Sequence, residues 1–571
     1  MIMATIAWSA EPVEVVIEGI EGAVLTNVQE ALVFPPGLVS DGKVDKLWLE
    51  RFAGNAYEKV LTALEPFGYY NARVTVTLGT VGESNYRLRI SVVPRKPVRI
   101  TAVKVGLDGP GANELSLKKL VADFPLKKGD ILIQPKYEEA KGVLKSQAQK
   151  LGYLDADFAV HEIRIDSDKT VAVIDLLLET GKQFHFDGTT IEGAPDYPNE
   201  FLRRNLTYKS GDIFSYDKLG ETQLNFTNSE RFKEVVVTPE KKEAQGDEVP
   251  MLVQVKQAPR WRIRPGVGYG TDTGGRFTLN FRDLNMFHLG HELSANLEIA
   301  ERLQGLAIKY TLPSPGDIRS STTLQLNLQH EDVTTYSSRL ESLELGRNYG
   351  LGKGRLLTAY LKLQQEDYTV GDQSSSSRLV LPGLRYTENH YNNLIRPSQG
   401  YRLALEARGT HQYLGSDTEL LQFITEGGYI TPLPWRLTLQ MRAKAGYTPL
   451  SGPLTNLPPD LRFFAGGDQS VRSYTYQSLG PQNAIGQVVG GKDLLFGSIE
   501  MERALFKNWG ISLFYDAGNA FDSYLNIHLA QGTGPGLHYY TPVGALNIYV
   551  ARQLGVSNPH IRIAFTVGFE L

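Results

Sequence analysis

The 571-residue chain contains no cysteine. This absence excludes disulfides, thiolate metal sites and cysteine nucleophiles. The chain also lacks a run of about eighteen uninterrupted apolar residues, so an α-helical membrane protein is excluded. Mean hydropathy is −0.23. A membrane β-barrel is still compatible with that value, because its strands alternate lipid-facing and lumen-facing residues. The length is too great for one compact core and predicts several domains.

A block of charge of one sign is lacking as well. The 59 Lys and Arg residues and the 63 Asp and Glu residues are interspersed, with a formal net charge of −4. A protein that binds the phosphate backbone carries a concentrated basic stripe, so we do not expect nucleic acid as a partner. The opening segment Met1–Ala10 has no charged start and is too short for a complete signal peptide. It is either the remnant of an export signal or an added start.

The first 257 residues alternate short β-rich runs with helical runs. The order strand, helix, helix, strand, strand occurs three times, and two landmarks recur in register. Phe67-Gly-Tyr-Tyr70 resembles Leu151-Gly-Tyr-Leu154, and Lys128-Gly-Asp-Ile131 returns as Ser210-Gly-Asp-Ile213. A glycine that ends a helix explains part of this likeness, but two landmarks at nearly constant spacing predict an internal repeat. The predicted domains are residues 11–95, 96–180 and 181–258, followed by 259–571.

After residue 258 the helical pattern disappears and apolar and polar residues alternate. In Thr323-Leu-Gln-Leu-Asn-Leu-Gln329 the three leucines share one face and the polar side chains share the other. A soluble sandwich also alternates in this way. The segments here often run about ten residues and are flanked by aromatic residues, as tilted membrane strands are. The predicted fold is therefore α+β N-terminal repeats followed by an all-β transmembrane barrel of about sixteen antiparallel strands, with fourteen or eighteen as alternatives.

Few segments of the sequence resemble an enzyme motif. His288-Leu-Gly-His-Glu292 does not have the helical zinc spacing and lies in a predicted hairpin. Gly350-Leu-Gly-Lys-Gly354 lies between two alternating runs and is predicted to be a hairpin turn, without the strand and helix that flank a phosphate loop. We therefore expect no enzyme activity, no cofactor and no metal.

The irregular segment Arg462–Pro481 is rich in glycine and aromatic residues, and two alternating strands follow it. On those strands Glu500 and Asp516 lie on the polar face, opposite an apolar face that must meet lipid, so both carboxylates are predicted to point into the lumen. Two such carboxylates repel each other unless a cation lies between them. Arg472 is the candidate cation. The alternative, that all three are solvated side chains of a water-filled pore, is equally compatible with the spacing.

These residues resemble the BamA superfamily of outer-membrane assembly proteins. The sixth extracellular loop of that family carries Val/Ile-Arg-Gly-Phe/Tyr, and this sequence has Val471, Arg472, Ser473 and Tyr474. If the family backbone there needs a positive φ, the serine costs about 1 kcal/mol. The resemblance implies that Arg472 contacts Glu500 and Asp516. Further similar segments are the strand motif Phe514-Tyr-Asp-Ala-Gly518, the strand Ser498–Met501, and the C-terminal segments Gly532–Gly544 and Val567–Leu571.

The resemblance also implies a location and partners. The repeats would be POTRA domains in the periplasm, and the barrel would lie in the bacterial outer membrane. Three repeats are most similar to the outer-membrane subunit of the translocation and assembly module. That subunit implies a TamB-like inner-membrane-anchored periplasmic partner and outer-membrane protein clients such as autotransporters, with lipid passage between membranes as a further implied role.

A weak seam is predicted between the first and last barrel strands. The first strand carries a proline, which cannot donate a ladder hydrogen bond, and three glycines, which pack poorly. A poorly paired seam is a latent sheet edge that incoming strands could use as a lateral gate. Glycines also mark ordinary barrel bends, and a passive porin or a secretion transporter for one dedicated substrate are alternative functions. The seam residues are Pro265, Gly266, Gly268, Gly270 and Gly568.

Overall fold

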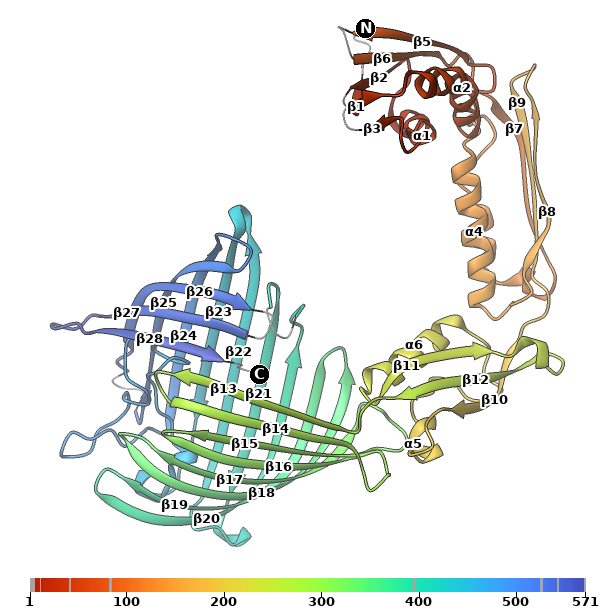
Figure 1. The fold of residues 1–571 in the computed structure, drawn as a ribbon. Helices are drawn as coiled ribbons and strands as arrows, with labels where there is room; N and C mark the ends of the chain where they lie inside the picture. Colours follow the sequence, from red (N-terminus) through yellow and green to blue (C-terminus); the bar gives the residue numbers. More distant parts are fainter. Residues whose placement is uncertain are drawn as a thin grey trace. The chain divides into compact units, whose positions relative to one another are not determined.

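The computed structural model describes residues 6–10, 12–40, 43–81, 85–393, 397–523, 527–541 and 544–568. Three small β-sheets, each with helices, come first in the chain, and a closed barrel follows (Figure 1). No helix within these ranges is long and apolar enough to span a membrane. The fold class predicted from the sequence is confirmed.

Each N-terminal sheet belongs to one repeat with the predicted order of strand, helix, helix, strand, strand. The three sheets have the strand orders β1-β2-β6-β5, β7-β9-β8 and β10-β12-β11. Strand β1, which pairs with β2, was not predicted. Repeat 1 contains β1 (Ile6–Ala10), β2 (Val13–Glu18), α1 (Gly22–Ala31), β3 (Val39–Ser40), β4 (Lys43–Val44), α2 (Lys46–Leu64), η1 (Glu65–Phe67), β5 (Arg73–Val81) and β6 (Asn85–Val93). Repeat 2 contains β7 (Arg99–Asp108), η2 (Pro110–Asn113), α3 (Leu115–Ala122), α4 (Gln134–Lys150), β8 (Asp157–Asp166) and β9 (Val171–Glu179). Repeat 3 contains β10 (His185–Glu192), α5 (Asn199–Arg203), α6 (Tyr216–Asn228), β11 (Phe232–Pro239), η3 (Lys241–Glu243) and β12 (Glu248–Gln257).

Helix α2 illustrates why these segments fold as they do. The side chain of Asp45 accepts a hydrogen bond from the backbone N–H of Trp48 at 3.1 Å and caps the first turn. Buried apolar residues then recur at three- and four-residue spacing from Leu49 to Leu64. One face of the helix therefore packs against the sheet and forms the core of repeat 1.

The two recurring landmarks contact each other between successive repeats. Gly68, at φ +86°, accepts a hydrogen bond from the amide of Val98 at 2.8 Å, and a Cβ on Gly68 would lie 2.9 Å from the carbonyl oxygen of Leu132. Gly152, at φ +92°, has the same place in the next joint, where a Cβ would lie 2.9 Å from Cγ2 of Ile213. Only glycine suits this close approach at positive φ. The landmarks recur because they form the contact between one repeat and the next, which we call the joint.

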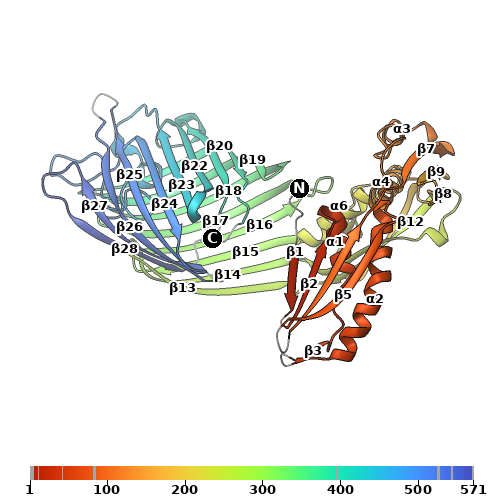
Figure 2. The same ribbon diagram turned by 90° about the horizontal axis from the view of Figure 1, so that it is seen from above.

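The barrel has sixteen strands, so fourteen and eighteen are excluded. Each strand pairs antiparallel with its neighbour in the chain, and the first and last strands lie side by side (Figure 2). The strands are β13 (Trp261–Gly270), β14 (Gly274–Met286), β15 (His291–Ala300), β16 (Leu303–Pro313), β17 (Ser321–Asp332), β18 (Tyr336–Gly352), β19 (Arg355–Val370), β20 (Gln373–Asn389), β21 (Gly400–Thr410), β22 (Leu420–Leu433), β23 (Leu437–Tyr447), β24 (Asp493–Ala504), β25 (Trp509–Phe521), β26 (Ala530–Thr541), β27 (Gly544–Leu554) and β28 (Ile561–Gly568).

The outer face of the barrel is apolar. Leu324, Leu326 and Leu328, which alternate with polar residues in β17, are all exposed on it. The segment from His288 to Glu292 contains the turn between β14 and β15. The segment from Gly350 to Gly354 contains the turn between β18 and β19. No group of metal-ligating side chains occurs among the described residues.

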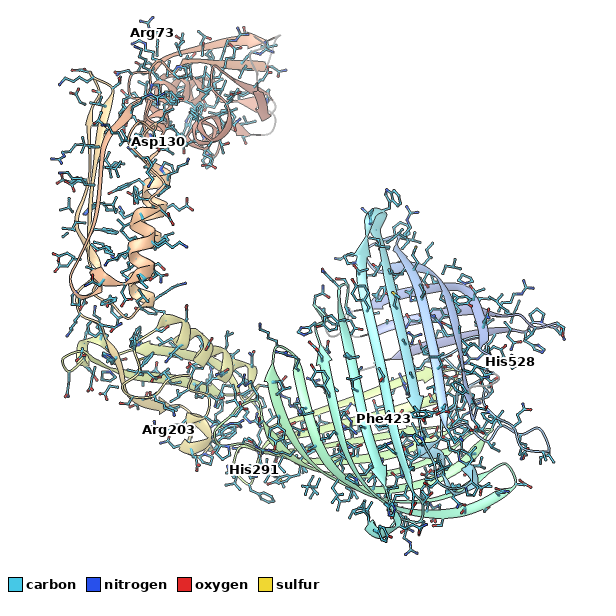
Figure 3. All side chains as sticks on the ribbon, turned by 180° about the vertical axis from the view of Figure 1, so that it is seen from behind. Arg73, Asp130, Arg203, His291, Phe423 and His528 are labelled. Carbon is cyan, nitrogen blue, oxygen red and sulfur yellow. The ribbon has the colours of Figure 1, made fainter. Side chains whose placement is uncertain are left out.

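Part of repeat 3, which includes residues 225–235, packs with the barrel at a junction that contains the buried Arg231. Arg231 donates hydrogen bonds to the carbonyl oxygens of Leu284 at 3.0 Å and Gly290 at 3.2 Å. Burial lowers the pKa of Arg231. Burial also opposes ionisation of the neighbouring Glu230, but Arg282 and Arg262 together lower the pKa of its carboxyl. Figure 3 labels Arg203 of α5 and His291 of β15 on the two sides of this junction. The junction marks the end of the barrel at which β13 begins.

Candidate functional site

Arg472 is buried in the lumen between two carboxylates. Its Nε and Nη2 donate to the two oxygens of Asp516 at 2.9 and 2.8 Å, and its Nη1 donates to Glu500 at 2.5 Å. The backbone N–H of Arg472 adds a bond of 3.0 Å to Asp516. Ser498 accepts from the guanidinium at 3.1 Å and donates to Asp516 at 2.7 Å. The planar guanidinium thus contacts both carboxylates at once.

Solvent does not reach this cluster. The side chains of Arg472, Glu500 and Asp516 are 1%, 8% and 0% exposed. The guanidinium carbon lies 3.7 Å from the ring centroid of Phe514 and 4.6 Å from that of Tyr549. The alternative of three solvated pore residues therefore does not hold, and the buried charges compensate one another.

The strand positions of these residues follow from the pleat. Glu500 and Ser498 alternate along β24 with outward-facing Ile499 and Met501. Asp516 lies directly opposite Ser498 in the register between β24 and β25. Gly518 continues the same face of β25, and a Cβ there would lie 2.9 Å from the carbonyl oxygen of Leu495.

The remaining residues of the loop motif are also enclosed. Val471 and Ser473 are buried, and Tyr474 donates its amide to the carbonyl oxygen of Val471 at 3.0 Å in a tight turn. Ser473 does not have a positive φ, so the backbone strain that the serine would cause at positive φ does not arise. Instead, the serine fits because residue 532 is glycine: a Cβ on Gly532 would lie 2.0 Å from the hydroxyl oxygen of Ser473.

The loop between β23 and β24 extends from this cluster to the opposite wall. Tyr476 donates to Glu331 of β17 at 3.2 Å, and the ring of Phe464 lies 5.3 Å from that of Tyr336 in β18. Lys362 of β19 pairs with Asp460 at 3.3 Å. The loop is therefore held on two sides of the lumen by charged and aromatic contacts.

Among the described residues, two residue pairs join β13 to β28, Tyr269 with Val567 and Gly270 with Thr566, whereas ten pairs join β13 to β14. Residues 569–571, which follow Gly568, lie outside the described residues. Among the described residues, the part of β13 from Trp261 to Gly268, which includes Pro265 and Gly266, has no strand partner on the β28 side. A side chain at position 268 would be too close to β28, because a Cβ there would lie 2.8 Å from the carbonyl oxygen of Val567.

A second ionic cluster, not predicted from the sequence, spans the seam. Arg562 of β28 donates to Asp272, in the turn after β13, at 2.7 Å and pairs with Asp468 of the loop at 2.9 Å. It also donates to the carbonyl oxygen of Arg472 at 2.8 Å, and the amide of Asp468 donates to Asp272 at 2.6 Å. We call Asp272, Asp468 and Arg562 the seam bridge. Its one sequence signal is that Arg562 is the only charged residue in the alternating segment 561–568.

Some of the predicted features lie outside the described residues. These are residues 569–571 of the C-terminal segment and residues 542 and 543 of the segment Gly532–Gly544. Gly568 is the last described residue of β28, where it lies opposite Ala545 of β27.

Comparison with known proteins agrees with this architecture. Residues 285–570 match the Omp85 superfamily domain, and residues 14–94 match the POTRA domain TamA domain 1. The outer membrane protein assembly factor BamA of Nitratidesulfovibrio vulgaris is 22% identical over 507 residues, which are 84% of this chain and 62% of the relative. BamA of Neisseria meningitidis is 21% identical over 514 residues, 81% of this chain and 62% of the relative. The chain thus spans less than two thirds of the length of these relatives.

A solved structure has the same fold. The crystal structure of BamA from Haemophilus ducreyi lacking POTRA domains 1–3 aligns with a TM-score of 0.70 at 17% identity, covering 82% of this chain and 99% of that one.

Proposed function

The chain belongs to the Omp85 superfamily of outer-membrane proteins, and we propose that it is an assembly factor that helps other outer-membrane proteins to insert or to be secreted. The observation that carries the proposal is the seam, where two residue pairs join β13 to β28 in the part of the chain that the structure describes. An unpaired sheet edge offers free backbone donors and acceptors to an incoming strand. A client strand would pair with β13 while its lipid-facing side chains enter the bilayer.

The buried loop would keep the barrel wall in place while the seam opens. Arg472 fastens the loop to β24 and β25 through Glu500 and Asp516. These strands are not part of the seam. The loop therefore stays attached to the rigid wall when β13 and β28 separate.

The seam bridge determines where separation would begin. Arg562 and Asp272 join the two strands on the side of the turn after β13, next to the hydrogen bond from Thr271 to the carbonyl oxygen of Phe565 at 3.0 Å. The opposite end of β13, which is near repeat 3, has no such bond to β28 among the described residues. Opening would therefore begin at the end near repeat 3, which is where periplasmic clients arrive.

Within the superfamily, we assign the chain to the TamA type. The match of residues 14–94 to TamA domain 1 and the three strand-helix-helix-strand-strand repeats support this assignment. In this proposal the POTRA repeats bind a TamB-like inner-membrane-anchored periplasmic protein, and autotransporters are among the clients. The exposed edges of β5, β8 and β11 would provide the pairing surface for partner or client strands.

A disulfide across the seam tests the gate, and the absence of native cysteine makes the test unambiguous. Tyr269 and Val567 are direct Cα partners, so the double variant Tyr269→Cys with Val567→Cys has the spacing that a disulfide needs. Oxidation is expected to stop assembly of an autotransporter client in proteoliposomes, and reduction is expected to restore it.

The matched control locks two strands far from the seam. Leu306 and Leu328 are also outward-facing Cα partners, in β16 and β17, so Leu306→Cys with Leu328→Cys forms a similar cross-link. That cross-link is expected to leave assembly unchanged. Full activity with the seam locked would refute the gate. Steady solute-selective conductance by the locked barrel would favour a porin, and export of one dedicated substrate alone would favour a secretion transporter.

A further inference from the structure

Two neighbouring turns at the periplasmic end of the barrel each present an exposed aromatic residue followed by a basic one. Trp435 and Arg436 lie in the turn between β22 and β23, and Phe506 and Lys507 lie in the turn between β24 and β25. Trp435 is 81% exposed and Phe506 is 73% exposed. Because successive strands are antiparallel, both turns lie at the end of the barrel where β13 begins, which is the end near repeat 3.

In the first turn, two bulky residues have a backbone conformation that is unfavourable for them, and the tryptophan side chain is exposed. Trp435 has φ +62° and Arg436 has φ +61°. Bulky residues rarely adopt these values, and glycine or asparagine is preferred in such hairpin turns. No packing contact requires a tryptophan there, because its side chain is mostly exposed. A large aromatic residue at such a position is explained if its ring has a partner outside the chain.

The two turns form one surface because their strands are paired. Leu437, the first residue of β23, lies opposite Arg503 near the end of β24. Arg503 follows Ile499 and Met501 on the outward face of β24, and all three are exposed. Trp509 begins β25 beside the same turn and is 40% exposed. We call Trp435, Arg436, Arg503, Phe506 and Lys507 the rim patch.

The rim patch carries three positive charges and no negative one. Among the described residues, Arg436, Arg503 and Lys507 form no ion pair within salt-bridge distance. The segments 431–438 and 503–510 contain no Asp or Glu. The nearest carboxylate in the sequence, Glu502, is buried on the lumen side, where Gln440 and Tyr540 donate to it. The patch is thus complementary to an anion on the outside of the barrel.

The position of the patch defines the chemistry of that anion. The outward side chains above it are apolar, so the three cations lie where hydrocarbon gives way to polar headgroups. Aromatic rings are favoured at this depth, and Lys and Arg side chains extend to headgroups from the ends of membrane strands. Guanidinium groups bind phosphate with two parallel hydrogen bonds.

We propose that the rim patch binds the phosphate headgroup of an anionic phospholipid in the periplasmic leaflet of the outer membrane. The bound lipid holds the ends of β24 and β25, the same two strands whose Glu500 and Asp516 hold Arg472. It therefore steadies the wall to which the buried loop is attached. The proposal needs the barrel to lie in the membrane, but it does not depend on client assembly.

Tryptophan fluorescence tests the proposal directly. The chain has five tryptophans, and replacing Trp8, Trp48 and Trp261 by phenylalanine leaves Trp435 and Trp509 as reporters at the patch. The full chain is reconstituted in phosphatidylcholine vesicles that contain either brominated phosphatidylglycerol or brominated phosphatidylcholine at the same mole fraction. Bromine quenches only nearby tryptophan. The expected result is stronger quenching by the brominated phosphatidylglycerol.

Two double variants make the comparison specific. Arg436→Gln with Lys507→Gln is expected to abolish the excess quenching. Lys353→Gln with Arg355→Gln removes two exposed cations at another periplasmic turn, after β18, and is expected to retain it. Equal quenching by the two lipids in the parent, or the same loss in both double variants, would overturn the proposal. Heat-dependent gel migration verifies that each variant has folded as a barrel.

Discussion

Arg562, on the last strand of the barrel, donates a hydrogen bond to Asp272, in the turn after the first strand, at 2.7 Å. Both side chains are largely buried, at 13% and 11% exposed. The pair closes one end of a seam in which, up to Gly568, two residues of each strand are paired. An interaction between side chains thus supplements an incomplete backbone ladder.

The pair should show energetic coupling. Asp272→Asn removes one of the two carboxylates that pair with Arg562, and Arg562→Gln removes the guanidinium that Asp272 and Asp468 share. Each change should therefore destabilise the barrel, and the double variant should cost less than the sum of the two. We expect a coupling of about 1 kcal/mol, within the ~0.5–3 kcal/mol range of contacting residues. Thermal unfolding followed by gel migration measures it. The exposed pair Lys256 and Glu234 is the control and should show little coupling; additive effects at Asp272 and Arg562 would contradict a bridge.

Arg472→Ala should leave a folded but weakened barrel with poor assembly activity. Removing the arginine takes away the guanidinium that the buried Glu500 and Asp516 share, and loss of one partner of a buried ion pair typically costs about 3–5 kcal/mol. Urea unfolding and a client-assembly assay measure the two effects. The control is Arg442→Ala, which removes a lumen guanidinium that bonds to Gln469 at 3.2 Å. Normal assembly by Arg472→Ala would show that the loop does not brace the wall.

Ser473 and Gly532 should compensate each other. Gly532→Ala places a methyl group against the hydroxyl of Ser473, where an ideal Cβ would lie 2.0 Å from the oxygen. The loop should then leave its site more often, and trypsin should cleave after Arg472 faster than in the parent. Ser473→Gly removes the obstructing atoms, so the double variant should be cleaved at nearly the parental rate. Equal cleavage of the single and double variants would show that this contact does not position the loop.

The joint between repeats 2 and 3 should depend on its glycine. Gly152→Ala combines a positive φ with a close approach to Ile213, which should cost about 1 kcal/mol or more. Hydrogen exchange of the Phe184 amide, which donates to Gly152 at 2.8 Å, should become faster in the full chain. Gly142→Ala is the matched control, because a Cβ on this residue of α4 meets nothing within 4 Å. In a helix that change should be neutral or stabilising.

Local patterns in the sequence predicted a large part of the fold and of the lumen site. Alternation of apolar and polar residues assigned Glu500 and Asp516 to the inner face, because successive side chains of a strand point to opposite sides. The recurring landmarks predicted the repeats, although not that Gly68 and Gly152 contact the next repeat. The loop motif suggested Arg472 as the cation between Glu500 and Asp516. The spacing of these residues in the sequence did not show whether they are buried or solvated.

The tertiary structure alone decided which distant segments meet. Asp272 and Arg562 are 290 positions apart, and the turn that holds Asp272 has no pattern that distinguishes it from other polar turns. The number of pairs in the seam likewise depends on how the sixteen strands are staggered when the barrel closes. Side-chain direction is a local property of the pleated backbone, so the sequence determined it. Closure and the seam bridge are properties of the whole ring, so no local pattern contains them.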